Sequence, residues 1–155
     1  MPLPSGLKAK VIFCLQKPIQ MKKDIQIPTV ENIHIAVVKQ FNEDLQEDIW
    51  TVFLINNSNT ALDTIFVVSQ AQGTIEDVVK ETTTFRHQYE ALAPFTALRV
   101  ELMEKAVLDL ENTFSVSYFQ NGKLYDKRFV FSAQSVADHN TTKLPVLDVL
   151  GVLAV

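Results

Sequence analysis

TFSVSYFQNGKLYDKRFVF, residues 113–131, is the stretch of sequence that most clearly indicates how this chain folds. Two segments that alternate between apolar and polar residues flank Asn121-Gly122 at its centre. Asn-Gly is a strong hairpin signal, because a type I′ turn requires positive φ at both of its central positions. The stretch therefore predicts an antiparallel hairpin with strands Thr113–Phe119 and Leu124–Phe131.

The predicted turn also fixes the register of the hairpin, because every later cross-strand pair follows from the first one. One face of the hairpin is then mostly apolar and the other polar, and a slip of one residue would mix the two sets. The predicted pairs are Gln120–Lys123, then Tyr118–Tyr125, Val116–Lys127 and Phe114–Phe129 on the apolar face, and Ser117–Asp126 and Ser115–Arg128 on the polar face.

Five further segments have the composition of β-strands, and no long segment repeats with the period of a helix. They are Ile33–Val38, Ile49–Ile55, Ala61–Ser69, Thr83–Ala91 and Ala97–Met103. Ile49–Ile55 is apolar except for Thr51, which predicts a strand buried on both faces. We expect it to form a hairpin with Ala61–Ser69 across a turn of about five residues.

Two of these strands alternate in a way that predicts which side chains face the core. In Thr83–Ala91, one face carries Phe85, His87 and Tyr89. In Ala97–Met103, the alternation places Leu98, Val100 and Leu102 toward the core and Arg99 and Glu101 toward solvent.

Three connections carry weaker signals. Thr74 followed by Asp77 resembles a capping box, so residues 70–82 predict either one or two helical turns or a long mobile loop. A short helix capped by Ser132 is expected over Ser132–Asp138, and a helical turn is expected within Glu104–Asn112.

About seven strands joined mostly by hairpins, without the spacing of βαβ units, indicate an antiparallel all-β domain. Sheets with one apolar face must cover that face, so the sequence predicts an immunoglobulin-like β-sandwich, with a small β-barrel as the alternative. The single cysteine, Cys14, excludes the Cys…Trp…Cys pattern of antibody domains and any disulfide within the chain.

Charge is distributed unevenly along the 155 residues. Residues 1–23 contain five lysines and no acid, so the net charge of −4 divides into +5 for this stretch and −9 for the remainder. An acidic body argues against nucleic-acid binding. No apolar run is long enough for a signal peptide or a membrane span, which predicts a cytoplasmic protein that does not bind membranes.

These features divide the chain into a basic extension over residues 1–23, a sandwich domain over 24–143 and an apolar tail over 144–155. Residues 1–20 are either an extension upstream of a translation start at Met21 or an additional N-terminal strand. The tail contains one charged residue, Asp148. We expect it to pack on the core, join a sheet edge or contact a partner chain.

Four short motifs are Met21–Pro28, Leu54-Ile55-Asn56-Asn57, Lys123–Lys127 and Gly151–Ala154. Through them the chain resembles, over roughly residues 21–155, a family of small bacterial all-β proteins. Some members carry the label of a phenylalanyl-tRNA synthetase subunit. The resemblance favours Met21 as the start and, at the level of that label, implies an accessory piece related to the synthetase. With three arginines, the chain does not match the catalytic domain of that enzyme.

The sequence contains no glycine-rich phosphate loop and no nucleophile elbow, so it assigns no catalytic residue and no cofactor. His34, His87 and His139 lie far apart and lack the spacing of metal ligands. Weak candidates for a cation site are the carboxylates of Glu43, Asp44, Glu47 and Asp48, which also fit a solvated connection between strands.

The function predicted from the sequence is a protein-interaction or scaffolding module that is not an enzyme and that forms a homodimer or binds another protein. The candidate interaction residues lie in the tail and are Leu144, Val146, Leu147, Val149, Leu150, Val152 and Leu153. The alternatives are a carrier of a small apolar ligand held between the sheets, the synthetase-related accessory piece, and an enzyme.

Overall fold

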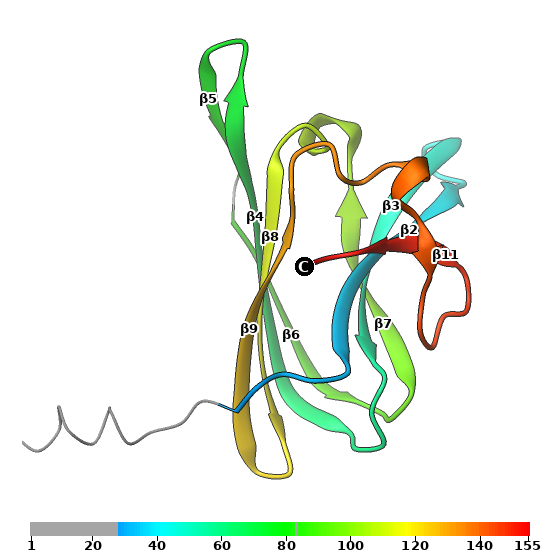
Figure 1. Cartoon of the computed structure of the whole chain (residues 1–155), viewed down its shortest axis with the longest axis vertical. Coiled ribbons are helices and arrows are strands. Elements are labelled where there is room, and N and C mark those ends of the chain that lie inside the picture. Colours follow the sequence, from blue (N-terminus) through cyan, green and yellow to red (C-terminus); the bar gives the residue numbers. More distant parts are fainter. Residues whose placement is uncertain (1–27, 83) are drawn as a thin grey trace, which may run out of the picture.

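The computed structural model describes residues 28–82 and 84–155 of the chain. The basic extension over residues 1–23, the start at Met21 and the alternative N-terminal strand therefore lie outside the described residues. The described residues form two antiparallel β-sheets that face each other, and Figure 1 shows the two layers.

The first sheet has the strand order β10-β11-β2-β3-β7, and the second has the order β5-β4-β8-β9 with β6 paired to β4 on the same edge as β5. In the first sheet the strands are β10 (Thr142–Lys143), β11 (Leu150–Leu153), β2 (Ile33–Asn42), β3 (Glu47–Asn56) and β7 (Thr96–Met103). In the second they are β5 (Val78–Glu81), β4 (Leu62–Ile75), β6 (Phe85–Leu92), β8 (Glu111–Gln120) and β9 (Lys123–Phe131).

This strand order is immunoglobulin-like. β2, β3 and β7 lie side by side and face β4, β8 and β9, which is the arrangement of strands A, B and E against C, F and G. The strand between C and E, here β6, pairs with β4 in the second sheet. Because the two sheets stay separate, the predicted sandwich is confirmed and the barrel alternative is wrong.

The hairpin that anchored the sequence prediction forms β8 and β9 with the expected register. Tyr118 is opposite Tyr125 and Gln120 is opposite Lys123, and the other predicted pairs are present as well. Asn121 and Gly122 have φ values of 54° and 75°, as a type I′ turn requires.

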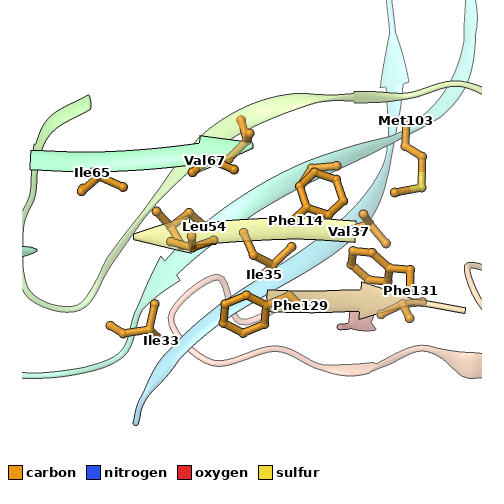
Figure 2. Close-up of a cluster of buried hydrophobic side chains, with 14 of the residues drawn as sticks. Ile33, Ile35, Val37, Leu54, Ile65, Val67, Met103, Phe114, Phe129 and Phe131 are labelled. Atoms are coloured by element: carbon orange, nitrogen blue, oxygen red, sulfur yellow. The ribbon is translucent and has the colours of Figure 1, made fainter. Parts of the chain in front are cut away.

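The core between the sheets is built from the inward-facing side chains of both layers. Figure 2 shows Ile35, Val37 and Leu54 of the first sheet packed against Phe114 and Phe129 of the second. All five are at most 2% exposed. The apolar faces of the hairpin and of β2 and β3 therefore cover each other, as the sandwich prediction requires.

β3 is buried on both faces, as its unbroken apolar composition predicted. Trp50, Val52 and Leu54 face the main core, whereas Ile55 belongs to a second apolar cluster on the outer face of the first sheet. Leu144, from the connection between β10 and β11, is 2% exposed and covers that outer face.

The expected hairpin between Ile49–Ile55 and Ala61–Ser69 is wrong, because β3 and β4 belong to different sheets. Asn56 holds the connection between them in place. Its side-chain amide donates to the carbonyls of Thr60 (3.0 Å), Leu92 (3.3 Å) and Ala93 (3.2 Å), and its Oδ1 accepts from Ser58. A fully buried asparagine thus satisfies the backbone where the chain crosses between the layers.

Residues 70–82 form neither helical turns nor a loop, which corrects both alternatives. β4 continues to Ile75, turns through Glu76 and Asp77 and returns as β5, with Ile75 opposite Val78. Glu76 and Asp77 have φ values of 51° and 64°, so they form the tight turn without a glycine. The pairing of β4 with β8 ends at Gln72, so Gly73–Glu81, here called the β4–β5 arm, projects beyond the sheet (Figure 1).

The helix expected over Ser132–Asp138 is also absent: Ser132 and Ser135 close a turn instead, and a 3₁₀ helix follows at Asp138–Asn140. The helical turn expected within Glu104–Asn112 is confirmed as a 3₁₀ helix at Lys105–Val107. Among the described residues no helix is long and apolar enough to cross a membrane.

The C-terminal tail joins both sheets. Val152 and Leu153 of β11 pair with Val37 and Ala36 of β2, so the tail extends the first sheet. The last residue then crosses to the second sheet, where Val155 and Val130 exchange two backbone hydrogen bonds of 3.0 and 3.1 Å. Figure 1 shows the C-terminus lying between the layers. The tail thus links the two sheets on one side of the sandwich.

Tyr118→Phe is expected to raise the free energy of unfolding by about 1 kcal/mol. The Tyr118 hydroxyl is buried and has no hydrogen-bond partner among the described residues. Burial, and secondarily the neighbouring Tyr125, also raise the pKa of Tyr118 far above its ordinary 10.0. As the pH rises through the ordinary value, the unfolded state ionises while the folded state stays neutral, so stability falls.

Denaturant titrations at neutral pH and at about pH 11 measure both effects. The variant should lose less stability than the parent at the higher pH. A variant that is clearly less stable than the parent at neutral pH would show that the hydroxyl is satisfied.

Deleting Ala154 and Val155 is expected to lower the free energy of unfolding by about 1–3 kcal/mol. The deletion removes the Val130–Val155 pair and the 2.9 Å bond from the Ala154 N–H to the Ile35 carbonyl. Val155→Ala is the matched control: it keeps the backbone and changes a side chain that is 88% exposed, so it should stay within about 0.5 kcal/mol of the parent.

Candidate functional site

The candidate site is a pocket of about 340 Å³ between the two sheets, on the side away from the C-terminal tail. β4 and β8 of the second sheet line it with Ser69, Ala71, Asn112 and Phe114. β7 of the first sheet contributes Glu101 and Met103, and Thr82, Phe85, Glu104 and Val107 line it as well.

A β-bulge in the first sheet places a carboxylate in this pocket. Val52 of β3 is opposite Glu101, but the next residue, Phe53, is opposite Arg99, so Val100 is an extra residue on β7. Because residues opposite each other share a face, Glu101 faces inward with Val52.

The bulge overturns part of the predicted alternation on this strand. Glu101 was expected toward solvent and lines the pocket, whereas Leu102 was expected inward and is opposite Thr51, on the other face of the sheet from Val52, although Leu102 also borders the pocket. Leu98 and Val100 do pack on the core, and Arg99 is exposed, as predicted. An extra residue reverses the phase of all later side chains in a strand, and local alternation cannot reveal it.

Glu101 is held by two donors from the second sheet. Ser69 Oγ donates to Glu101 Oε1 over 2.8 Å, and His87 Nε2 lies 2.7 Å from the same oxygen. Ser69 is 3% exposed, and the side chains of His87 and Glu101 are 25% and 22% exposed. The carboxylate therefore links the sheets on the side opposite the tail.

The environment of Tyr89 reflects the charge of this carboxylate. The rings of His87 and Tyr89 are stacked with their centroids 6.4 Å apart. Burial raises the pKa of the Tyr89 phenol, and the negative charge of Glu101 raises it further. His87 and Tyr89 therefore point into the gap beside Glu101, as the predicted alternation of β6 required.

Serine, histidine and glutamate also make up catalytic triads, but the order of contacts differs here. In a triad, histidine lies between serine and the acid and removes the serine proton. Here the carboxylate lies between Ser69 and His87, and both bind its Oε1. The arrangement leaves Ser69 without a histidine base, so Ser69 acts as a hydrogen-bond donor that orients the carboxylate rather than as an activated nucleophile.

The acidic residues predicted as weak cation ligands lie at the β2–β3 connection. Glu43 and Asp44 are in the turn, and Glu47 and Asp48 begin β3. Glu47 is 3.7 Å from Lys105. In residues 28–82 and 84–155 no three acidic, histidine or cysteine side chains come together in a way that could hold a metal ion.

The three histidines are placed separately. His34 is the second residue of β2, where burial and then the charge of Lys127 lower its pKa. His87 contacts the pocket residue Glu101, and His139 is exposed in the 3₁₀ helix Asp138–Asn140.

The predicted interaction residues of the tail divide into two groups. Leu144 and Val152 are buried, and Leu147 and Leu153 are partly buried against the outer apolar cluster. Val146, Val149 and Leu150 are 36%, 45% and 63% exposed. Most of the tail is therefore engaged in the fold itself.

Three residues of the candidate site, Ser69, His87 and Glu101, were not identified as functional from the sequence. They come from three strands and are not joined by any motif, so no spacing in the sequence brings them together. The strand register and the bulge supply that information.

Comparison of this chain with protein-family models and with curated proteins gives no match. The assignment of function therefore rests on the geometry of the chain itself.

Glu101→Ala is expected to lower the free energy of unfolding by about 1 kcal/mol, because the buried Ser69 hydroxyl loses its acceptor. The control is Glu90→Ala, which removes an exposed carboxylate from β6 and should change stability by less than about 0.5 kcal/mol. Denaturant titration compares the two. Equal stabilities would show that the Glu101 contacts do not hold the sheets together.

Proposed function

We propose that this protein is an interaction module that associates with a second copy of itself through the β4–β5 arm and catalyses no reaction. The observation that supports this proposal is the exposure of two valines on a hairpin that projects from the sandwich. Val78 is 54% exposed and Val79 is 78% exposed.

The arm contributes little to the core of its own domain. All four residues of β5 are exposed, and within residues 28–82 and 84–155 β5 pairs only with the end of β4. Its turn places two residues other than glycine, Glu76 and Asp77, at positive φ, a conformation that costs about 1–2 kcal/mol per residue. An exposed hairpin that packs little on the core is poorly explained by the stability of the domain and is available as a contact element.

The outer edge of β5 can accept another strand. In the part of the chain that the structure describes, β5 has one neighbouring strand, so its other edge keeps free backbone donors and acceptors. Such an edge invites strand addition, and the apolar valines provide side-chain contacts for it. The competing surface, the tail, has already used most of its apolar residues within the fold.

We propose that the strand added to this edge is β5 of a second copy of the chain. Antiparallel pairing of two β5 strands about a two-fold axis uses the same surface twice and joins two sheets into one. The whole chain has a net charge of −4, so two copies repel each other at long range. Association should therefore strengthen as salt screens that repulsion.

We place this module in the cytoplasm of a bacterium. A single cysteine in the chain means that the sandwich is held by packing and hydrogen bonds, without an internal disulfide. Such a fold suits a reducing compartment.

Val79→Lys is expected to shift the protein from dimer to monomer, because it places a charge on the pairing edge. Light scattering during size-exclusion chromatography, over a range of protein and salt concentrations, measures the change. Val79 is 78% exposed, so the substitution leaves the core unchanged.

Leu150→Lys is the matched control, because it places the same charge on the exposed tail, where Leu150 is 63% exposed. It should leave the dimer intact. Loss of the dimer in Leu150→Lys with survival in Val79→Lys would assign the contact to the tail. A parent protein that stays monomeric at every concentration and ionic strength would overturn self-association.

A further inference from the structure

We propose that the pocket beside Glu101 is a binding site for an ammonium group carried on an apolar stem. This inference goes beyond self-association and is independent of the arm, because it rests on the charge, the geometry and the walls of the pocket. It also differs from the purely apolar ligand expected from the sequence.

The charges that line the pocket are negative. Glu101 and Glu104 are among the lining residues and no lysine or arginine is, while His87, outside the lining, lies 2.7 Å from Glu101 Oε1 and leaves Oε2 to the pocket. A carboxylate in a partly buried site gains more from a cation than an exposed one does, because the local dielectric constant is lower. The lining therefore favours a positively charged group over a neutral or anionic one.

Glu101 is positioned for such a group before the ligand arrives. Ser69 and His87 both bind Oε1, which fixes the orientation of the carboxylate. The second oxygen, Oε2, makes no hydrogen bond with the described residues, so it is available to an incoming donor. A preoriented acceptor loses little conformational entropy on binding.

The walls of the pocket suit an apolar stem. Phe114 and Met103 are buried, whereas Phe85 is 53% exposed and lies at the rim. The face of an aromatic ring also attracts a cation. A volume of about 340 Å³ is at the small end of ligand pockets, so the stem is short.

Two sources can supply this chemistry: a free small amine, or a lysine side chain of a partner protein. The probes are therefore 2-phenylethylamine for the free amine and Nα-acetyl-lysine methylamide for the side chain. 2-Phenylethanol is the neutral match of the first probe. Chemical shifts of the backbone amides of Ser69, Phe85 and Glu101 report binding at the pocket during NMR titrations.

At least one ammonium probe should bind saturably and about tenfold or more tightly than 2-phenylethanol, which is typical of a hydrogen bond between charged groups. Stronger binding of the phenyl probe would indicate a free amine, and stronger binding of the lysine probe a partner side chain. Equal affinities for 2-phenylethylamine and 2-phenylethanol, with no saturable binding of the lysine probe, would overturn the proposal.

Glu101→Gln should reduce the affinity of the better probe about tenfold while keeping a side chain that can bind Ser69. Phe85→Ala is a second variant, and because Phe85 is 53% exposed the substitution leaves the core intact. It should weaken binding as well. Glu90→Gln is the matched control for the loss of a carboxylate and should bind the probe as the parent does. Val79→Lys changes only the arm and should also bind the probe as the parent does.

If Glu101→Gln and Phe85→Ala both retain their folded spectra and bind the probe as the parent does, the pocket is not the site. If Val79→Lys abolishes the dimer but binds the probe normally, the arm and the pocket are separate functions. If the pocket binds no probe but Val79→Lys still converts the dimer to a monomer, the ammonium site is wrong and self-association through the arm is supported.

Discussion

The mutual burial of two apolar sheet faces is the interaction on which the rest of this structure depends. Each sheet presents one inward face of branched aliphatic and aromatic side chains, and neither face can remain in water without the other. Phe114 and Phe129 of the second sheet pack on Ile35 and Leu54 of the first (Figure 2). This packing sets the separation of the layers, and the contacts at the edges of the sandwich form across that separation.

The two open sides of the sandwich are joined in different ways. On the side of β2 and β9, the C-terminus crosses between the layers and Val155 binds Val130 through the backbone. On the side of β6 and β7, a carboxylate, Glu101, binds Ser69 and His87. Backbone pairing joins the layers on the first side and a side-chain cluster joins them on the second, and a hollow lies beside each link. The sandwich is therefore asymmetric in how its two sides are joined, and only the second side places a carboxylate, Glu101, in its pocket.

The two proposed binding surfaces adjoin each other at Thr82. This residue follows β5, lines the pocket and accepts a hydrogen bond from the Ala71 N–H through its hydroxyl over 2.9 Å. The base of the arm is thus anchored next to the pocket, while its tip lies beyond the sheet (Figure 1). Strand addition at the arm and cation binding in the pocket use different chemistry, backbone hydrogen bonds for one and a fixed carboxylate for the other.

The sequence by itself determined the features that depend on neighbouring residues. Asn121-Gly122 requires a tight turn, so the hairpin and its register followed from local chemistry. The sheet assignment of β3, the integration of the tail and the inward direction of Glu101 were decided by the tertiary structure. Each depends on a pairing between segments that are distant in the chain, and a one-residue bulge reverses the faces of a strand without changing its composition. Alternation can therefore predict that a strand has two faces, but only its partners decide which face is buried.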